Sequence, residues 1–97
     1  MELYGILRHN GWSSEAELQA AALRSTEVGE EMDDRVRWIR SYVISEPSGA
    51  LGTFCIYEAV STEAIHEHAS RAGLPVDDIV KIADTVIVQA DPAVAAG

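Results

Sequence analysis

The sequence is poor in basic residues and in cysteine, and it has no long apolar run; each shortage excludes a class of protein. Seven Lys and Arg residues stand against sixteen Asp and Glu residues among 97, which gives a net charge of −9. Nucleic acids and anionic membrane surfaces are bound through clustered Lys and Arg, so we expect neither as a partner. No apolar run reaches the roughly 20 residues of a membrane-spanning helix.

The single cysteine, Cys55, excludes an internal disulfide framework and is typical of a protein from a reducing compartment. The first ten residues lack the charged, apolar and small-residue order of a signal peptide. We therefore expect a cytoplasmic location. The hydrophobic content of 47% is that of an ordinary globular protein. Residues 1–90 are expected to form one domain, and residues 91–97, which are rich in Ala, a flexible tail.

Apolar periodicity and turn residues divide the chain into six elements. Helices are predicted from about Ser13 to Met32 and from Ser61 to Ala72, because serine caps followed by acidic residues open each segment. Gly73 and Pro75 end the second helix. On the first helix we expect an apolar face of Ala16, Leu18, Ala20, Leu23 and Val28. Strands rich in β-branched and aromatic residues are predicted at 2–8, 36–44, 53–59 and 79–88.

This order, βαββαβ, predicts an α+β ferredoxin-like fold with a four-stranded antiparallel sheet. Two helices cover one face of such a sheet, and the other face also needs a cover. We expect a second copy of the chain to supply that cover, so that a homodimer forms an α/β barrel.

Strand alternation sorts the side chains of the sheet into two sets. The plain apolar residues Ile39, Val43, Phe54 and Ile56 suit the face under the helices. The other set is expected on the face away from the helices, where it forms either a dimer interface or the wall of a small-molecule cavity. Its members are the candidate ligand-binding residues Tyr4, Arg8, Trp38, Arg40, Tyr42, Cys55 and Tyr57.

The histidines of the second predicted helix give the candidate metal ligands. His66 and His68 lie about 200° apart around the helix axis, so they cannot bind one ion together. Glu63 and His66 share the outer face, where they form either a divalent-ion site or an ordinary solvated surface. His68 lies on the inner face, as a hydrogen-bonded core residue, a metal ligand or a ligand-binding residue. The sequence contains no HExxH, CxxC or GxSxG motif and no glycine-rich phosphate loop.

Three segments together resemble a known family: Trp38-Ile-Arg-Ser-Tyr-Val43, Cys55-Ile-Tyr-Glu-Ala59, and His68-Ala69 followed by Ala72-Gly-Leu-Pro75. The chain is similar over most of its length to a small bacterial family of domains of unknown function, known as nickel-binding proteins after one characterised member. The resemblance implies a ferredoxin-like fold assembled as a dimeric α/β barrel, and nickel as the bound metal. It marks the pattern positions Trp38, Ser41, Tyr42, Cys55, Tyr57, His68 and Gly73.

Three functions follow from these observations. The first is a metal-binding protein for nickel or a similar divalent ion, held by Glu63, His66 or His68. The second is an enzyme of the monooxygenase or cyclase type that uses the cavity between two sheets, with His68 as its base. The third is a structural module whose sheet face serves only to form a dimer.

Overall fold

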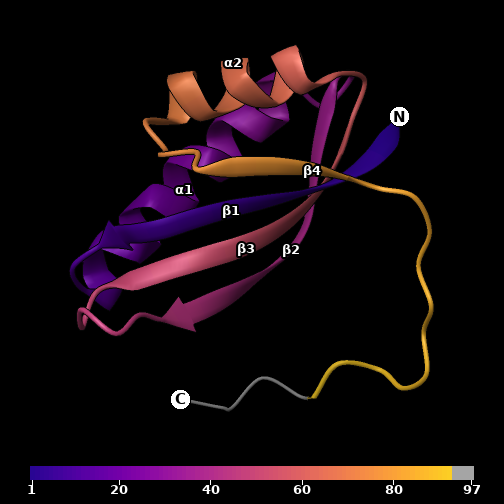
Figure 1. The fold of residues 1–97 in the computed structure, drawn as a ribbon. Helices are drawn as coiled ribbons and strands as arrows, with labels where there is room; N and C mark the ends of the chain where they lie inside the picture. Colours follow the sequence, from indigo (N-terminus) through magenta and orange to yellow (C-terminus); the bar gives the residue numbers. More distant parts are fainter. Residues whose placement is uncertain (93–97) are drawn as a thin grey trace.

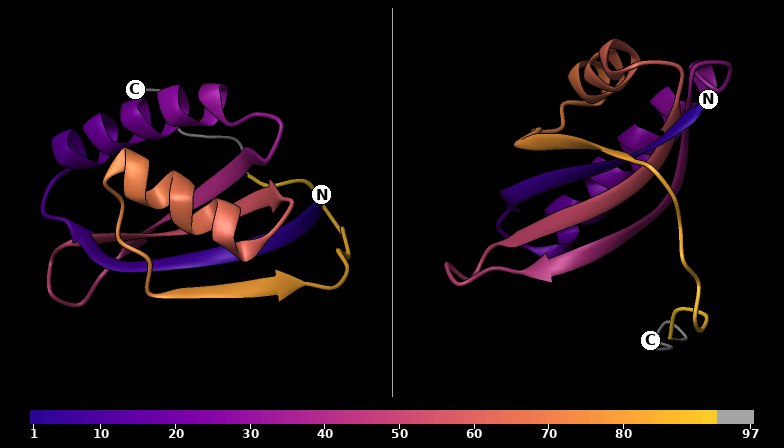
Figure 2. Two further views of the ribbon diagram at one scale, coloured as in Figure 1. Left: turned by 90° about the horizontal axis from the view of Figure 1, so that it is seen from above. Right: turned by 45° about the vertical axis from the view of Figure 1, so that its right-hand side comes forward.

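The computed structural model describes residues 1–92 and confirms the predicted order of elements. It contains β1 (Glu2–Trp12), α1 (Glu15–Glu31), β2 (Val36–Ser45), β3 (Leu51–Ala59), α2 (Thr62–Ala72) and β4 (Asp78–Ile82). The four strands form an antiparallel sheet in the order β2-β3-β1-β4. Both helices lie on one side of it, and the opposite face carries no helix formed by residues 1–92 (Figures 1 and 2). The fold is therefore the ferredoxin-like α+β sandwich. No helix among residues 1–92 is long and apolar enough to cross a membrane.

The helix ends lie where the sequence places them. The hydroxyl of Ser14 accepts a hydrogen bond from the backbone N–H of Glu17, and that of Ser61 accepts one from Ala64. Each hydroxyl satisfies a donor that the first turn of a helix leaves without a partner. Gly73 ends α2 in the left-handed conformation, with φ of 69°, which a residue without a side chain adopts at little cost.

The buried face of α1 differs from the predicted one. Ala21, Ser25 and the C-cap residue Met32 are buried, whereas Leu23 is 68% exposed, and Ala16 and Ala20 are also exposed. Leu18 and Val28 are half-buried. The buried stripe combines Leu18 and Val28, which were predicted, with Ala21, Ser25 and Met32, which were not, although all five follow the helical period. The polar Ser25 interrupts the apolar pattern of this stripe.

The last strand is shorter than predicted. β4 ends at Ile82, and residues 83–92 form no strand. This segment passes beside the sheet toward β2 (Figure 1), where the Asp91 carboxylate accepts hydrogen bonds from Arg40 (3.1 Å) and Tyr42 (3.0 Å). Of the predicted tail, residues 93–97 lie outside the described part of the chain.

On β1 and β3 the two faces are the reverse of the prediction, whereas Val43 of β2 lies on the helix-covered side as predicted. Tyr4, Cys55 and Tyr57 pack under the helices in one core cluster with Ile65 of α2. Phe54 and Ile56 instead lie on the face without helices. The prediction assumed that only plain apolar residues fit beneath helices. The helices, however, present small residues such as Ala21, Ser25, Ala64 and Ala69, and these leave room for large side chains with polar ends.

A bulge in β2 divides the candidate ligand-binding residues between the two faces. Trp38 pairs with Tyr57, but Arg40 pairs with the next residue of β3, Ile56, so that Ile39 has no partner in the register. One extra residue reverses the alternation beyond it. Trp38 therefore lies under the helices, whereas Arg40 and Tyr42 lie on the open face, contrary to the prediction that all three share a face.

The close approach of β3 to β1 requires a glycine at position 52. A Cβ atom added to Gly52 would lie 2.5 Å from the backbone oxygen of Arg8 and 3.3 Å from the carboxylate of Glu46. We expect Gly52→Ala to lower the free energy of unfolding by about 1–3 kcal/mol, because a backbone atom must move. Urea titration of both proteins measures this change.

Gly29→Ala serves as the control for that substitution. Its added Cβ would lie 3.8 Å from Nε2 of His68, an ordinary contact inside α1. Alanine favours the helix over glycine, so this variant should be more stable by about 0.5–1 kcal/mol. Equal stability of the wild type and Gly52→Ala would contradict the proposed contact.

Candidate functional site

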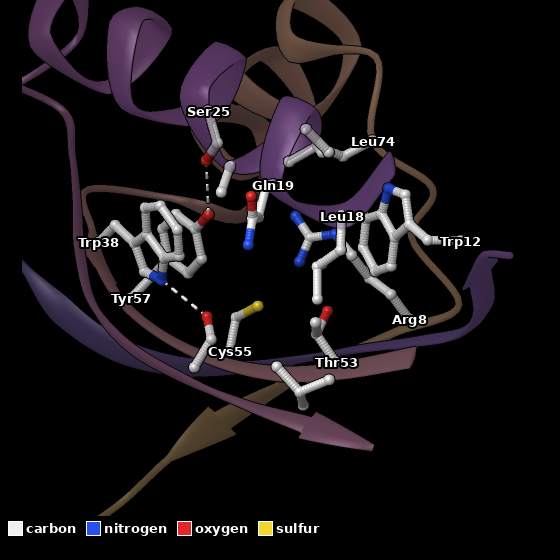
Figure 3. Close-up of a pocket in the computed structure, with 14 residues that line it drawn as sticks. Arg8, Trp12, Leu18, Gln19, Ser25, Trp38, Thr53, Cys55, Tyr57 and Leu74 are labelled. Atoms are coloured by element: carbon white, nitrogen blue, oxygen red, sulfur yellow. Dashed lines mark hydrogen bonds between the residues drawn. The ribbon is translucent and has the colours of Figure 1, made fainter. Parts of the chain in front are cut away.

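A cavity of about 230 Å³ lies between α1 and the helix-covered face of the sheet. Its wall is formed by fourteen residues from β1, α1, β2, β3 and the segment after α2 (Figure 3). Most of the wall is apolar, with Trp12, Trp38, Leu18, Val43 and Leu74 as its larger apolar side chains. The polar side chains of the wall are those of Arg8, Gln19, Ser25, Ser41, Thr53, Cys55 and Tyr57.

Tyr57 links the sheet to α1 at one end of this cavity. Its ring stacks against Trp38 with a centroid distance of 6.3 Å, and its hydroxyl lies 3.3 Å from the Ser25 hydroxyl (Figure 3). Burial raises the pKa of the Tyr57 phenol, although the hydrogen bond with Ser25 and the positive charge of Arg8 oppose this shift. At neutral pH, Tyr57 is therefore a protonated phenol that fixes α1 over β3.

Arg8 is the unusual residue of the cavity. Its side chain is 1% exposed, and its guanidinium points into the cavity beside the Tyr57 ring, 5.9 Å from the ring centroid (Figure 3). Within residues 1–92, none of its three guanidinium nitrogens has a hydrogen-bond partner. The hydroxyl of Thr53, which is paired with Arg8 across β1 and β3, is likewise buried without a partner there.

His68 lies behind Tyr57 rather than in the cavity wall. Its ring meets that of Tyr57 edge to face at 5.4 Å, and its Nε2 is 3.1 Å from the Ser25 carbonyl oxygen. A carbonyl oxygen only accepts, so Nε2 carries the hydrogen. Burial lowers the pKa of His68 and the charge of Arg8 lowers it further, while the hydrogen bond to Ser25 acts in the opposite direction. His68 is thus a neutral core residue.

These positions bear on the enzyme hypothesis. His68, the predicted base, does not line the cavity, and no Asp, Glu or His occurs among the fourteen lining residues. A general base must reach the proton that it removes within hydrogen-bond distance. Arg8 and the apolar side chains of the wall suit the cavity to holding a ligand by charge and contact.

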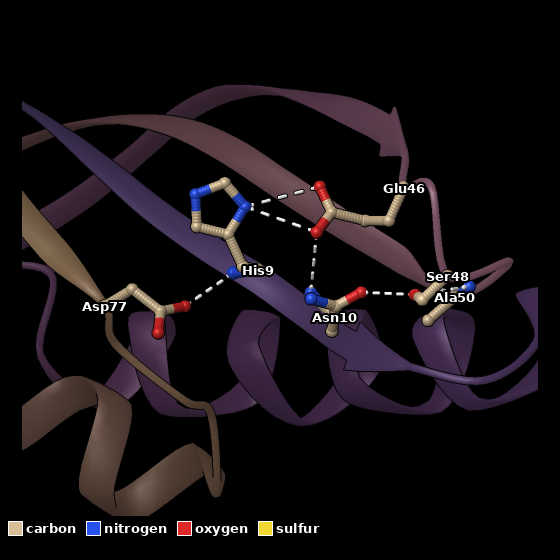
Figure 4. A network of polar contacts seen from close by, with 6 residues as sticks. All are labelled: His9, Asn10, Glu46, Ser48, Ala50 and Asp77. Atoms are coloured by element: carbon tan, nitrogen blue, oxygen red, sulfur yellow. Dashed lines mark hydrogen bonds and ion pairs between the residues drawn. The ribbon is translucent and has the colours of Figure 1, made fainter.

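A polar network fixes β1 where the strand is irregular. Glu46 is buried and lies within 3.2 Å of the His9 ring and of the Asn10 backbone N–H, while Asp77 accepts a hydrogen bond from the His9 backbone (Figure 4). Asn10 adopts the left-handed conformation, with φ of 51°, which asparagine tolerates. The register resumes at Trp12 opposite Leu51, so this irregularity returns Trp12 to the helix-covered face beside the cavity.

The predicted metal ligands do not form one site. His66 is exposed on the outer side of α2 with Glu63, whereas His68 is buried and points inward. The neighbouring carboxylate of Glu67 binds Arg35 through both oxygens at 2.9 and 3.0 Å. Among residues 1–92, no group of three or more His, Cys, Asp or Glu side chains is placed to hold a metal ion.

The structure brings together four of the eight candidate ligand-binding residues. Arg8, Trp38, Cys55 and Tyr57 line the cavity. Tyr4 belongs to the core cluster beyond the lining, and His68 lies behind Tyr57.

Sequence reasoning missed further lining residues, among them Trp12, Leu18, Ser25, Thr53 and Leu74. Thr53 alternates with Cys55 and Tyr57 along the same strand, so strand alternation alone could have identified it as a lining residue. Trp12 could not be identified in this way, because its strand was expected to end before Asn10 and Gly11.

Comparison with known proteins places the chain in a family. The family described as "Nickel responsive protein SCO4226-like" matches residues 4–82. The chain belongs to this family. A crystal structure of SCO4226 from Streptomyces coelicolor A3(2) superposes with a TM-score of 0.69, covering 87% of this chain and 99% of that one at 20% identity. At that identity the similarity shows the shared fold. A search of curated proteins found no match.

The lowered pKa of His68 predicts a pH dependence of stability. Its ordinary pKa is 6.5; above this value neither the folded nor the unfolded state holds the proton, and no stability is lost. As the pH falls below about 6.5, the unfolded state takes up the proton first, so stability falls by at most about 1.4 kcal/mol per pH unit until the folded pKa is passed. Urea titrations at pH 7.5 and at lower pH measure this slope.

Substituting single histidines by glutamine tests which histidine causes this loss of stability at low pH. His68→Gln keeps an N–H donor toward Ser25 and does not titrate, so it should show a shallower loss of stability than the wild type. His66→Gln, on the exposed side of α2, should retain the wild-type slope. An unchanged slope in His68→Gln would show that His68 is not the buried neutral residue described above.

Proposed function

We propose that this SCO4226-like protein binds Ni²⁺ or a similar divalent ion on its surface. The observation that carries the proposal is the family match over residues 4–82. Nickel binds well to imidazole and also accepts carboxylate oxygens. The net charge of −9 raises the concentration of cations near the surface, although it does not select among them.

Burial narrows the choice of imidazole ligand. Of the three histidines, His68 is 1% exposed and directs Nε2 to the Ser25 carbonyl, so the proposed ligands are the accessible His9 and His66. His66 shares the outer side of α2 with Glu63, and His9 lies against Glu46 (Figure 4). Each pair supplies one nitrogen and one carboxylate. Water or a second copy would complete the coordination, and weak binding is expected.

We also propose that the protein works as a homodimer in the cytoplasm. The open face of the sheet carries Phe54 and Ile56, with Tyr42 43% and Val80 46% exposed. Next to it, Val86–Val88 are 76–86% exposed. Apolar surface of this kind is typical of an interface. The lone cysteine, Cys55, is buried and unpaired, which fits a reducing compartment.

Calorimetric titration of the metal-free protein with Ni²⁺ tests the metal proposal. His9→Gln or His66→Gln should weaken binding at least about tenfold at the site that it removes, because each pair has only one imidazole. His68→Gln is the matched control and should bind like the wild type. Absence of heat in the wild type, or unchanged binding in both surface variants, would refute the proposal for these ligands.

Mass in solution tests the proposed dimer. Ile56→Glu places a charge at the centre of the open face and should shift the protein to the mass of a monomer, since an unpaired charge is costly to bury. Leu23→Glu, on the exposed side of α1, is the matched control and should leave the mass unchanged. Sedimentation equilibrium distinguishes the two states. A monomeric wild type would contradict the dimer without affecting the metal titration.

A further inference from the structure

The wall of the cavity contains a positive charge that the described chain does not neutralise. Nε, Nη1 and Nη2 of Arg8 are all buried without a hydrogen-bond partner within residues 1–92, and so is Oγ1 of Thr53. None of the fourteen lining residues is acidic. Buried polar groups are normally satisfied, and leaving a charged donor without a partner is costly.

The orphan groups are placed to act together. Arg8 and Thr53 are directly opposite each other on β1 and β3, and both side chains project to the helix-covered side. In Figure 3 the guanidinium lies within the cavity, with Thr53 on the adjacent strand. Water in the cavity would satisfy hydrogen bonds but would leave the charge uncompensated. A bound anion supplies both the hydrogen-bond acceptors and the compensating negative charge.

The geometry favours a carboxylate among anions. A guanidinium binds the two oxygens of a carboxylate through parallel hydrogen bonds, and the hydroxyl of Thr53 provides a further donor. One buried positive charge neutralises one negative charge, so a doubly charged phosphate would bring an excess charge into a mostly apolar cavity.

The apolar side chains of the cavity wall indicate the character of the rest of the ligand. Trp12, Trp38, Leu18, Val43 and Leu74 present apolar surface around a cavity of about 230 Å³. This wall suits a small organic acid with an apolar body. The net charge of −9 opposes the approach of polyanions, so recognition of an anion here is a local effect of Arg8.

We propose that the cavity under α1 is a binding site for a small organic monocarboxylate, whose carboxylate pairs with Arg8 and Thr53 and whose apolar body contacts Trp12 and Trp38. Nothing in this assignment depends on the metal proposal, because the accessible His9 and His66 do not line the cavity.

Cyclohexanecarboxylate is a suitable probe, with cyclohexanecarboxamide as its neutral match of nearly equal shape. Both of the two tryptophans in the chain line the cavity, so their fluorescence reports occupancy directly. A rise in melting temperature gives a second readout, because binding to the folded state alone stabilises it. We expect the acid to bind at least tenfold more tightly than the amide. Inorganic phosphate, which lacks the apolar body, should produce neither signal.

Variants assign this selectivity to the cavity. Arg8→Met should lose the preference for the acid and, without ligand, melt at a higher temperature than the wild type, because it removes an unpaired buried charge. Arg37→Met removes an exposed arginine and should keep the full preference. If Arg8→Met fails to fold, Thr53→Val provides a milder change, with an expected loss of about threefold to tenfold in the preference.

Either of two results would overturn the proposal. One is a wild type that binds acid and amide equally, or binds neither at millimolar concentration. The other is a folded Arg8→Met that retains the preference for the acid. Both are independent of the nickel titration.

Discussion

A buried arginine with no hydrogen-bond or ion-pair partner among residues 1–92 is the constraint on which the helix-covered side of this fold depends. The guanidinium of Arg8 lies under α1, 1% exposed, against the face of the Tyr57 ring. The face of the ring attracts the guanidinium. Ala21 and Ser25 are the buried residues of α1, and both are small. The cavity exists because these small side chains do not fill the space above Arg8.

The elements and their order could be predicted from the sequence, but the assignment of faces could not. Serine caps and Gly73 mark the helix ends through local chemistry, and the βαββαβ order follows from changes in the spacing of apolar residues along the chain. Which side of β3 faces the helices depends on how much room the helices leave, a tertiary property that strand alternation does not contain. The expectation of a dry, purely aliphatic core therefore placed Cys55 and Tyr57 on the wrong face.

The prediction of individual residues of the candidate site from the sequence is limited in the same way. Strand parity correctly grouped Trp38, Cys55 and Tyr57, and the presence of Arg8 beside them was also expected. The bulge at Ile39 separated Arg40 and Tyr42 from that group, and no sequence signal marks a bulge within a run of β-branched and aromatic residues. Trp12 and Ser25 belong to the cavity through a strand irregularity and a helix packing angle, which only the assembled fold defines.

The cavity is joined to the contact between the two helices by a short chain of interactions. Arg8 lies against the Tyr57 ring, the Tyr57 hydroxyl meets the Ser25 hydroxyl, and the Ser25 carbonyl accepts the hydrogen of His68 on α2. The positive charge of Arg8 also helps to keep His68 neutral. Neutralising Arg8 would weaken that repulsion, so the charge state of the cavity and the packing of α1 against α2 are physically linked. The polar residues under the helices thus form one electrostatic unit, whereas His9 and His66 lie outside it and are free to serve a separate role.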